Sequence, residues 1–249
     1  MKTTTGILNK TSPQYRGLVA CWDARSGSPS ALRNMVTREI ASRTGSPTIA
    51  GSERGLALSV TAGFQYWDAP FVAQNSLGNM LSWSYWGKSS ATSFQHAMSR
   101  DVAGSRSWLV GVENGQMWLD VFSPAGTEYR RNTTVPYADG RWHHFAHTFN
   151  GNASGQITAY FDGVKVDQVN TNFAGIYDTT INVKIGAWGY NTGYAWNGLL
   201  ADLRIYKVCK SQGEILAIFQ KPGDLYKASR ASYALARLVS PALRWRHGG

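Results

Sequence analysis

Residues 140–207 restrict the fold of this chain most strongly, because they read as short β-forming runs separated by turns. One of these turns is Asp162–Gly163, which stands between the runs ITAYF and VKV. An Asp-Gly pair between two such runs is a strong signal for a β-hairpin, since glycine adopts a positive φ without steric cost. The segment therefore predicts an all-β fold, and it points to binding rather than to catalysis.

The composition agrees with such a fold and supplies enough apolar volume for a sizeable core. The chain has 249 residues, of which 43% are hydrophobic and 12% aromatic, including ten Trp and twelve Tyr. Its 26 glycines and a charged fraction of 16% suit a β protein that is rich in turns. All-β sandwiches of this length often form one domain, so the length does not require a second one.

Further strands are expected on both sides of the segment. GLVACW (17–22) has the composition of a first strand, whereas residues 24–54 are rich in Ser, Gly, Arg and Pro and are expected to be mostly loop. In LSWSYW (81–86) the residues alternate with a period of two, which predicts a strand with one buried face. SWLVGV (107–112) and QMWLDV (116–121) are joined by Glu-Asn-Gly and are expected to form a hairpin.

One short helix is expected near the C-terminal end of the body. Ser211 is followed three residues later by Glu214, which is the capping-box pattern of a helix start, and apolar residues follow. Pro222–Gly223 should end this helix, because proline removes a backbone donor and cannot continue the helical hydrogen bonding.

The pattern divides the chain into an N-terminal arm (1–14), a body (15–221) and a basic C-terminal arm (222–249). The formal net charge is +10, and residues 221–249 hold six basic residues against one acid, which is half of that excess. A basic end can meet an acidic protein surface or nucleic acid. This arm is short and mixes its arginines with apolar residues, so we expect it to dock on a protein. Its candidate partner-binding residues are Arg237, Arg244, Trp245 and Arg246, of residue types that are enriched among interface hot spots.

Several segments together carry a resemblance to a known family. They are GLVACWD (17–23), LSWSYWGK (81–88), GRWHHFAHTFNG (140–151), ITAYFDGVKV (157–166) and NGLLADLRIYK (197–207), the last followed by the Ser-x-x-Glu helix start. Over about residues 15–219 the chain resembles the laminin-G-like branch of the concanavalin A-like lectin/glucanase superfamily. The resemblance implies two antiparallel sheets packed as a jelly-roll sandwich, with the first and last strands near each other. It says little about function, since one architecture hosts many functions.

A second resemblance concerns the two ends of the chain. RGLVACW at residues 16–22 and the Arg/Trp-rich segment 237–246 are similar to the ends of small laminin-G-like proteins in tailed-bacteriophage virions. This implies a non-enzymatic capsid decoration or cement protein, present in repeated copies, whose arms bind neighbouring virion subunits. MKTTTGILNK lacks the apolar run of a signal peptide, and no segment is long and apolar enough to span a bilayer. We therefore expect synthesis in the host cytoplasm and a place in the virion, with no membrane partner.

Catalytic and metal-binding patterns are not evident in the sequence. Hydrolysis by paired carboxylates needs two acids about 5–10 Å apart, and the glucanase relatives place theirs in a Glu-x-Asp-x-x-Glu-like pattern that this sequence lacks. His143, His144 and His147 suggest a zinc site, but side chains alternate along a strand, and positions 143 and 147 are about 13 Å apart on one. We expect His147 to be a hydrogen-bonded core residue. The sequence predicts no enzyme, no metal and no cofactor.

An aromatic cluster near the end of the body supports an alternative function. Trp188, Tyr190, Tyr194 and Trp196 lie within nine residues, together with Asn191. Aromatic faces with a nearby amide can hold a sugar ring, so the alternative is a lectin-like receptor-recognition component of a phage tail or fibre. A second interpretation places Trp188 and Trp196 in the core or at strand ends and only the tyrosines on a loop. The candidate glycan-binding residues are Tyr190, Asn191, Tyr194 and Trp196.

Two cysteines, Cys21 and Cys209, are too few for a disulfide framework. In the implied fold the first and last strands are neighbours, which could bring the two thiols together. We nevertheless expect both to be free and buried.

Overall fold

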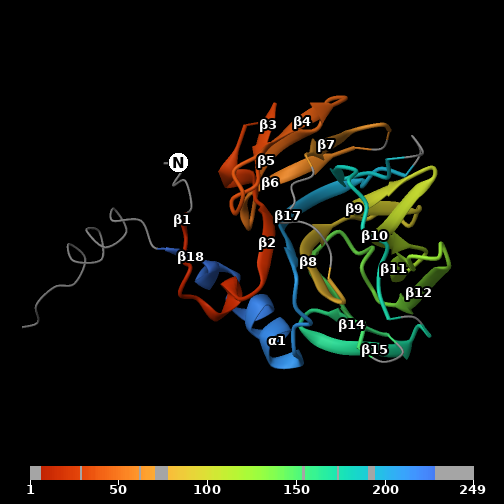
Figure 1. The fold of residues 1–249 in the computed structure, drawn as a ribbon. Helices are drawn as coiled ribbons and strands as arrows, with labels where there is room; N and C mark the ends of the chain where they lie inside the picture. The colour runs from red at the N-terminus through yellow and green to blue at the C-terminus, as the bar shows by residue number, and fades with distance from the viewer. Residues whose placement is uncertain are drawn as a thin grey trace, which may run out of the picture.

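The computed structural model describes residues 7–28, 30–61, 63–70, 78–152, 155–172, 174–189 and 194–227. Two antiparallel sheets face each other across the core and form the body of the molecule (Figure 1). This arrangement confirms the all-β two-sheet sandwich with one short C-terminal helix that the sequence predicts. In the described part of the chain, no helix is long and apolar enough to cross a membrane.

We name the two sheets by strands that they contain. The β9–β12 sheet has the order β12–β11–β10–β9–β16–β7–β4–β3. Its strands are β3 (Ala31–Arg33), β4 (Ile40–Thr44), β7 (Tyr66–Ala69), β9 (Gln95–Val102), β10 (Ser105–Glu113), β11 (Gln116–Phe122), β12 (Glu128–Thr134) and β16 (Val183–Ile185).

The β8–β17 sheet has the order β15–β14–β13–β8–β17–β6–β5, and β2 also pairs with β17. Its strands are β2 (Leu18–Trp22), β5 (Thr48–Ser52), β6 (Gly55–Val60), β8 (Met80–Lys88), β13 (Trp142–Asn150), β14 (Gln156–Phe161), β15 (Val164–Asn170) and β17 (Gly198–Tyr206). The pairing of β2 with β17 confirms that the first and last strands of the predicted sandwich are neighbours.

The two predicted hairpin turns are present and have the backbone that their residues favour. Asp162 and Gly163 have φ angles of 48° and 78°, and Asn114 and Gly115 have φ angles of 46° and 75°. Two successive positive φ angles match the right-handed twist of the flanking strands, which is why Asn-Gly and Asp-Gly occur at such turns. These turns fix the registers of β14 with β15 and of β10 with β11.

Tryptophan rings fill much of the space between the sheets. Trp22, Trp67, Trp83, Trp108 and Trp196 are buried in this core. The ring of Trp83, from the β8–β17 sheet, lies 5.5 Å from the ring of Trp108, from the β9–β12 sheet. Large rings that meet across the gap bury much apolar area, which stabilises the packing of one sheet on the other.

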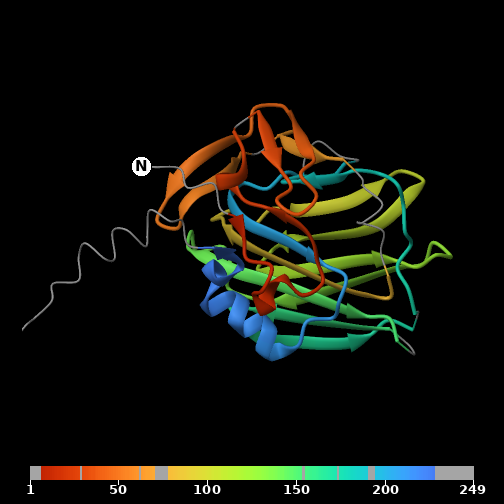
Figure 2. The ribbon, with the colours of Figure 1, turned by 60° about the vertical axis from the view of Figure 1, so that its left-hand side comes forward.

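The outer face of the β8–β17 sheet is covered by helix α1 (Gln212–Gln220) and by segments near both chain ends (Figure 2). The helix starts at the predicted capping box, in which Ser211 and Glu214 bond each other's backbone. Phe219 of α1 stacks on Trp86 with ring centres 5.5 Å apart. β8 is therefore buried on both faces, and the prediction of a single buried face for residues 81–86 is wrong because α1 covers the other one.

Residues 24–54 contain the short strands β3, β4 and β5, which were not predicted, although more than half of the segment lies outside strands, as expected. These strands are short and lie at or next to the ends of the sheets, and about half of their residues are exposed. Their composition therefore shows little alternation, and pairing with β6 and β7 makes them strands. Such tertiary pairing overrides weak local propensity.

Residues near both chain ends pack against the outer face of the β8–β17 sheet. β1 (Ile7–Leu8) pairs with β18 (Tyr226–Lys227), and Leu225 is fully buried. The buried Arg204 guanidinium joins these segments: it donates to Asp202 (Nε–Oδ1 2.7 Å), to Gln14 Oε1 (2.7 Å) and to the Pro222 carbonyl (2.9 Å). The Arg204 guanidinium thus links Gln14 and Pro222 to β17.

Three short 3-10 turns complete the described elements, at Pro13–Tyr15, Ala24–Ser26 and Pro222–Leu225. Cys21 is buried and Cys209 half-buried, and both are free, as expected. Burial raises the pKa of the Cys21 thiol to about 12, which keeps it protonated and unreactive.

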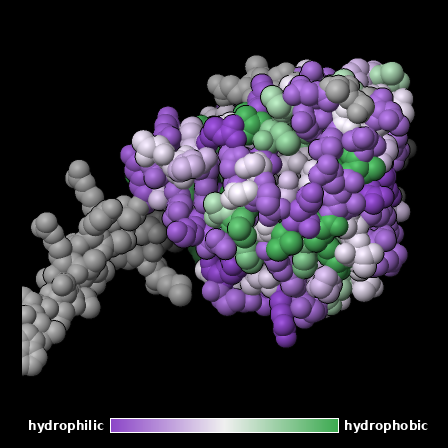
Figure 3. Space-filling view, turned by 90° about the horizontal axis from the view of Figure 1, so that it is seen from below, coloured by the Kyte–Doolittle hydropathy of each residue, from purple (hydrophilic) through white to green (hydrophobic). Residues whose placement is uncertain are grey.

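The end of the body that carries α1 and β15 shows mostly polar residues, with apolar residues in small groups between them (Figure 3). The edge strand β15 exposes Val164 and Val166 on either side of the exposed Lys165. A charged side chain on an edge strand discourages pairing with another chain.

Candidate functional site

The outer face of the β9–β12 sheet carries a second, smaller apolar cluster, which lies apart from the main core. Along β11, Met117, Leu119 and Val121 belong to the core. Trp118 and Phe122 form the outer cluster together with Leu109 of β10. This separation follows from the alternation of side chains along a strand.

Trp118 lies flat across the neighbouring strand because β10 has a glycine at that position. A Cβ added at Gly111 would lie 2.0 Å from the Gln95 carbonyl oxygen and 2.5 Å from the Trp118 ring, distances that real Cβ atoms do not reach. Phe94 then stacks on Trp118, with ring centres 4.9 Å apart and planes 11° apart. One missing side chain thus creates the flat base on which the other rings of this face are built.

Three further rings extend the flat surface formed by Phe94 and Trp118. His96 stacks on Trp188 at 5.5 Å, and Trp188 stacks on Tyr194 at 5.8 Å. Tyr194 also meets Phe94 edge to face at 4.9 Å. We call Phe94, His96, Trp118, Trp188 and Tyr194 the aromatic platform. Phe94, Trp188 and Tyr194 are half-buried, whereas His96 and Trp118 are fully buried beneath them.

His96 is a neutral acceptor at the base of the platform. Its Nδ1 lies 3.0 Å from the carbonyl oxygen of Tyr194, so Nδ1 carries the proton and donates it. Burial lowers the pKa of His96 to about 3, which keeps the ring uncharged. Its Nε2 is buried and has no hydrogen-bond partner among the described residues.

Two arginines flank the platform, and each is held by a buried aspartate. Arg130 donates to both oxygens of Asp120, at 2.7 and 2.5 Å. Arg106 donates to Asp101 (Nε–Oδ1 3.1 Å, Nη2–Oδ2 3.2 Å). Both aspartates are buried, and both arginine side chains are more than a third exposed. Each pair therefore presents its guanidinium to the solvent and its carboxylate to the sheet.

Opposing effects act on the pKa values of the two buried carboxyls. Burial raises the pKa of Asp101 and of Asp120, and the hydrogen bonds from their arginines act against that shift. The hydrogen bond to Asp120 in turn raises the pKa of Arg130. Hydrogen bonds between ionised partners favour both charged forms, so the two pairs remain ionised near neutral pH.

The guanidinium groups also lie over aromatic rings. Arg106 is 4.0 Å from the centre of the Phe122 ring and 6.0 Å from that of Trp188. Arg130 is 5.2 Å from Phe94 and 5.3 Å from Trp118. Carboxylate and ring together fix each arginine in one orientation, with cation–π attraction adding to the ion pair.

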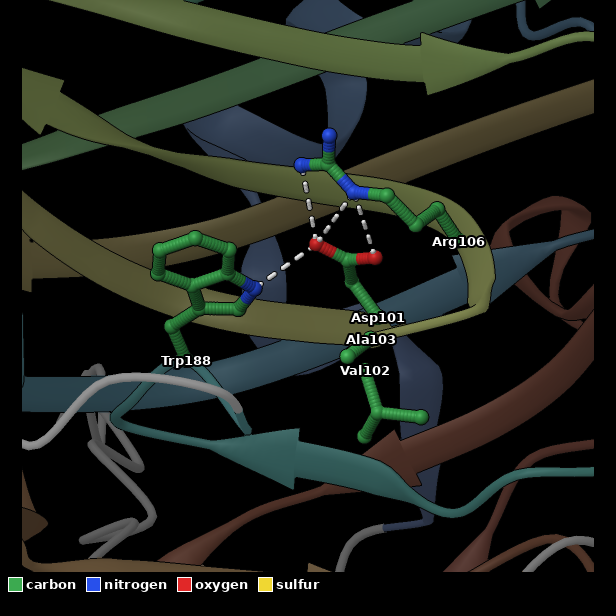
Figure 4. A pocket seen from close by; sticks show the side chains of 5 residues that line it. All are labelled: Asp101, Val102, Ala103, Arg106 and Trp188. Carbon is green, nitrogen blue, oxygen red and sulfur yellow. Dashed lines mark hydrogen bonds and ion pairs between the residues drawn. The ribbon is translucent and has the colours of Figure 1, made fainter. Parts of the chain in front are cut away.

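A small pocket opens between Trp188 and Arg106. Its volume is about 230 Å³, and Asp101, Val102, Ala103, Arg106 and Trp188 line it (Figure 4). The Trp188 indole donates to Asp101 Oδ2 at 2.7 Å, which locks its orientation at the pocket wall. Pockets for drug-sized ligands measure about 300–1,000 Å³, so this one suits a single small group.

Of the glycan-binding residues predicted from the sequence, the structure places one on the platform and one in the core. Tyr194 lies in the platform. Trp196 is fully buried between the sheets, where its ring meets Tyr85 at 6.0 Å, so it cannot contact a ligand on the outer face. Tyr190 and Asn191 lie outside the described residues, as do the partner-binding candidates Arg237, Arg244, Trp245 and Arg246.

Several platform residues were not predicted, although one signal for them is local. In QMWLDVF (116–122) the two faces of β11 can be separated by alternation, which assigns Trp118, Asp120 and Phe122 to one side. Phe94 directly precedes β9, and His96 and the two arginines lie on other strands than β11. Strand pairing brings them to the same place, and no local pattern signals it.

The histidines of β13 form no metal site. The described residues contain no group of His, Cys, Asp or Glu side chains that could hold a metal ion. His143 bonds Asp162 and Asp139, and His144 Nε2 lies 2.8 Å from the Ser84 hydroxyl. His147 is a core residue, as predicted, but its predicted hydrogen bond is absent: neither ring nitrogen has a partner among the described residues.

Solved structures with a similar fold include two toxin binding domains. The binding domain of Paraclostridial Mosquitocidal Protein 1 matches with a TM-score of 0.68 and 11% identity, over 83% of this chain and 52% of that one. The Botulinum neurotoxin serotype D ligand binding domain, in complex with N-acetylneuraminic acid, matches with a TM-score of 0.63 and 12% identity, over 82% and 50%. This chain therefore spans about half the length of each. At these identities the likeness shows the fold alone.

Domain 4 of AbnA, a GH43 extracellular arabinanase from Geobacillus stearothermophilus, was solved in complex with arabinotriose and is a third similar structure. It matches with a TM-score of 0.58 and 16% identity, over 82% of this chain and 98% of that one. The two chains are therefore of similar extent.

Sequence comparison gives the family directly. A search of curated protein sequences found no match. A family model described as Concanavalin A-like lectin/glucanases superfamily matches residues 61–216, which is more than half of the chain. The chain belongs to the concanavalin A-like lectin/glucanase superfamily.

Proposed function

We propose that this domain binds carbohydrate on the aromatic platform. The observation that carries the proposal is the half-buried pair Trp188 and Tyr194, stacked 5.8 Å apart and flanked by two oriented arginines. Aromatic faces supply the apolar contact that a sugar ring needs, and a few placed polar groups fix its orientation.

Two of the similar structures support this function, since their crystals contained N-acetylneuraminic acid and arabinotriose. The platform offers the chemistry for such ligands within one face of the sheet. The sequence-based alternative, a lectin-like recognition component, therefore has more support than the main prediction of a capsid decoration protein.

We further propose that binding takes place without hydrolysis. Among the acids near the platform, Asp120 accepts hydrogen bonds from Arg130, and Asp101 and one oxygen of Glu128 accept from Arg106. A general acid must hold a proton that it can deliver, and a nucleophile needs a free oxygen. Ion pairs with arginine oppose both roles.

Isothermal titration calorimetry against a panel of oligosaccharides tests the proposal. Trp188→Ala should lose binding, because it removes the half-buried ring and its bond to Asp101. Trp142→Ala is the matched control, a half-buried tryptophan at the start of β13 in the other sheet, and it should bind normally. Failure of the wild type to bind any glycan, or equal loss in both variants, would refute the assignment. Chromatography of the same mixtures should show no cleaved product.

We also propose that the terminal segments attach this protein to the subunits of a virion. β1 and β18 pair antiparallel, and Ile7 lies opposite Lys227. The first and last described residues are therefore neighbours. The basic residues Arg237, Arg244 and Arg246 follow β18 in the sequence. A surface with acidic groups, such as a shell of virion subunits, fits such a segment.

A truncation after Lys227 tests this role without disturbing the body. It keeps Leu225, which is fully buried, and Tyr226, whose hydroxyl donates to Asp202 at 3.0 Å. The truncated protein should fold and bind glycans as before, but it should no longer attach to particles. Full occupancy of particles by the truncated protein would argue against the virion role.

A further inference from the structure

We infer that the platform prefers sugars that carry a carboxylate; this inference rests on the proposed function and names the ligand class. It follows from which hydrogen-bonding groups of the platform are already used. Binding sites select ligands by the polar groups that remain unpaired when the ligand is absent.

The two buried carboxylates of the site are occupied. Both oxygens of Asp120 accept from Arg130. Asp101 Oδ2 accepts from the Trp188 indole and from Arg106, and Oδ1 accepts from Arg106 as well. Both carboxylates are also buried, so they cannot meet the hydroxyl groups of a sugar on the surface.

The unused groups are mainly donors. An arginine has five N–H groups, and Arg130 uses only Nε and Nη2, on Asp120. Its Nη1 has no hydrogen-bond acceptor among the described residues, and the residue is exposed. Arg106 donates one Nη1 hydrogen to Glu128 and one Nη2 hydrogen to Asp101. A second hydrogen on each of these nitrogens is left for a ligand.

These donors are already oriented for an anion. The carboxylate partner lies on the sheet side of each pair and an aromatic ring lies against each guanidinium, so little side-chain freedom remains to be lost on binding. A guanidinium matches the geometry of a carboxylate and can bind it through two parallel hydrogen bonds. Because the paired aspartate lies inside, the guanidinium of each pair faces the solvent; at Arg106 the exposed Glu128 lies beside it, so Arg130 is the freer of the two cations.

The two arginines flank the rings on which a sugar would lie. Arg106 is 6.0 Å from the Trp188 ring, and Arg130 is 5.2 Å from Phe94, which meets Tyr194 at 4.9 Å. A sugar stacked on Trp188 and Tyr194 would therefore bring a ring substituent near one guanidinium or the other.

Calorimetry with matched acidic and neutral sugars tests the inference on the full chain at physiological salt. The first pair is sialyllactose and lactose, and the second is trigalacturonate and its methyl ester. Short probes limit contacts with the basic C-terminal segment. The acidic member of at least one pair should bind roughly tenfold to a hundredfold more tightly, as expected for charged hydrogen bonds. The two pairs distinguish a sialic acid from a uronic acid.

The double variants Asp120→Asn/Arg130→Gln and Asp101→Asn/Arg106→Gln locate the carboxylate. Each replaces an ion pair by a neutral pair, so no buried charge is left alone. At least one should bring the ratio of acidic to neutral affinity close to one, while Trp142→Ala should leave the ratio as it is. Arg130→Lys, which keeps the charge but loses the fork of donors, gives the same comparison if a double variant does not fold.

The outcomes separate the two levels of the proposal. Equal affinity for acidic and neutral sugars would overturn the carboxylate preference and leave carbohydrate binding in place. An acidic preference that survives both double variants would place the anion site elsewhere and would also overturn the inference. Binding of no sugar at all would remove the proposed function itself.

Discussion

His147 provides a strong test of the core, because its imidazole is enclosed without a hydrogen-bond partner. The side chain is fully buried, and both ring nitrogens lack partners among the described residues. Burial lowers the pKa of His147 to about 3, whereas an exposed histidine titrates at about 6.5. Replacement by methionine, which has a similar volume and no charge, removes this titration from the core.

The size and sign of the effect follow from proton uptake by the unfolded chain. As the pH falls below about 6.5, the unfolded chain binds a proton at His147, and the folded protein does not do so until about pH 3. The unfolded state holds more protons throughout this window, so the free energy of unfolding falls with the pH. Between pH 7 and pH 5 the wild type should lose about 2 kcal/mol through this residue, and His147→Met should lose none of it.

Urea unfolding at pH 7, 6 and 5 gives the free energy of unfolding of the wild type and of His147→Met. The variant should be at least as stable as the wild type at pH 7, because a buried unpaired polar group costs about 1–3 kcal/mol. Its advantage should then grow by about 2 kcal/mol on going to pH 5. Met98→Leu, an apolar exchange at another fully buried site, should differ from the wild type by an amount that does not depend on pH. A constant difference for His147→Met as well would refute the enclosed, unpaired histidine.

Three further predictions concern the base of the platform and the opposite face of the sandwich. Gly111→Ala should destabilise the fold by about 1–3 kcal/mol or more and weaken glycan binding, because the new Cβ would lie 2.0 Å from the Gln95 carbonyl oxygen and 2.5 Å from the Trp118 ring; thermal unfolding and calorimetry measure the two effects. Asp202→Ala should cost about 3–5 kcal/mol in urea unfolding, since it leaves the buried Arg204 guanidinium without its ionic partner, and an unchanged midpoint would contradict the buried pair. Ser211→Ala should cost about 1 kcal/mol by loss of the helix cap, and Ser211→Asp should retain most of the stability.

The features that the sequence predicts correctly are those with a local cause. The turns at Asn114–Gly115 and Asp162–Gly163 need positive φ angles, and few other residue pairs tolerate them. The helix start depends on Ser211 and Glu214, which are three residues apart and bond each other's backbone. In such cases the side chains that determine the structure lie in the segment itself, so no knowledge of the fold is needed.

The features that the sequence does not predict depend on partners far along the chain. The outer face of β8 is buried by residues far along the chain, such as Phe219, more than 130 residues later, which stacks on Trp86. Similarly, Phe94, Trp118 and Tyr194 belong to one platform because β9, β10 and β11 pair in a given register and the chain returns beside them after β16. Periodicity assigns a residue to a face of its own strand, but it does not reveal which residues of other strands share that face.

The two proposals for this chain are compatible because they use opposite sides of the sandwich. The platform lies on the outer face of the β9–β12 sheet, whereas β1, β18 and α1 cover the outer face of the β8–β17 sheet (Figure 2). A partner that contacts the body beside β1 and β18 would therefore lie behind the platform and leave Trp188 and Tyr194 accessible. Protein immobilised through its C-terminal end should accordingly bind glycans with the affinity that it has in solution. Loss of binding on immobilisation, with the fold intact, would show that the ends and the platform compete for the same side.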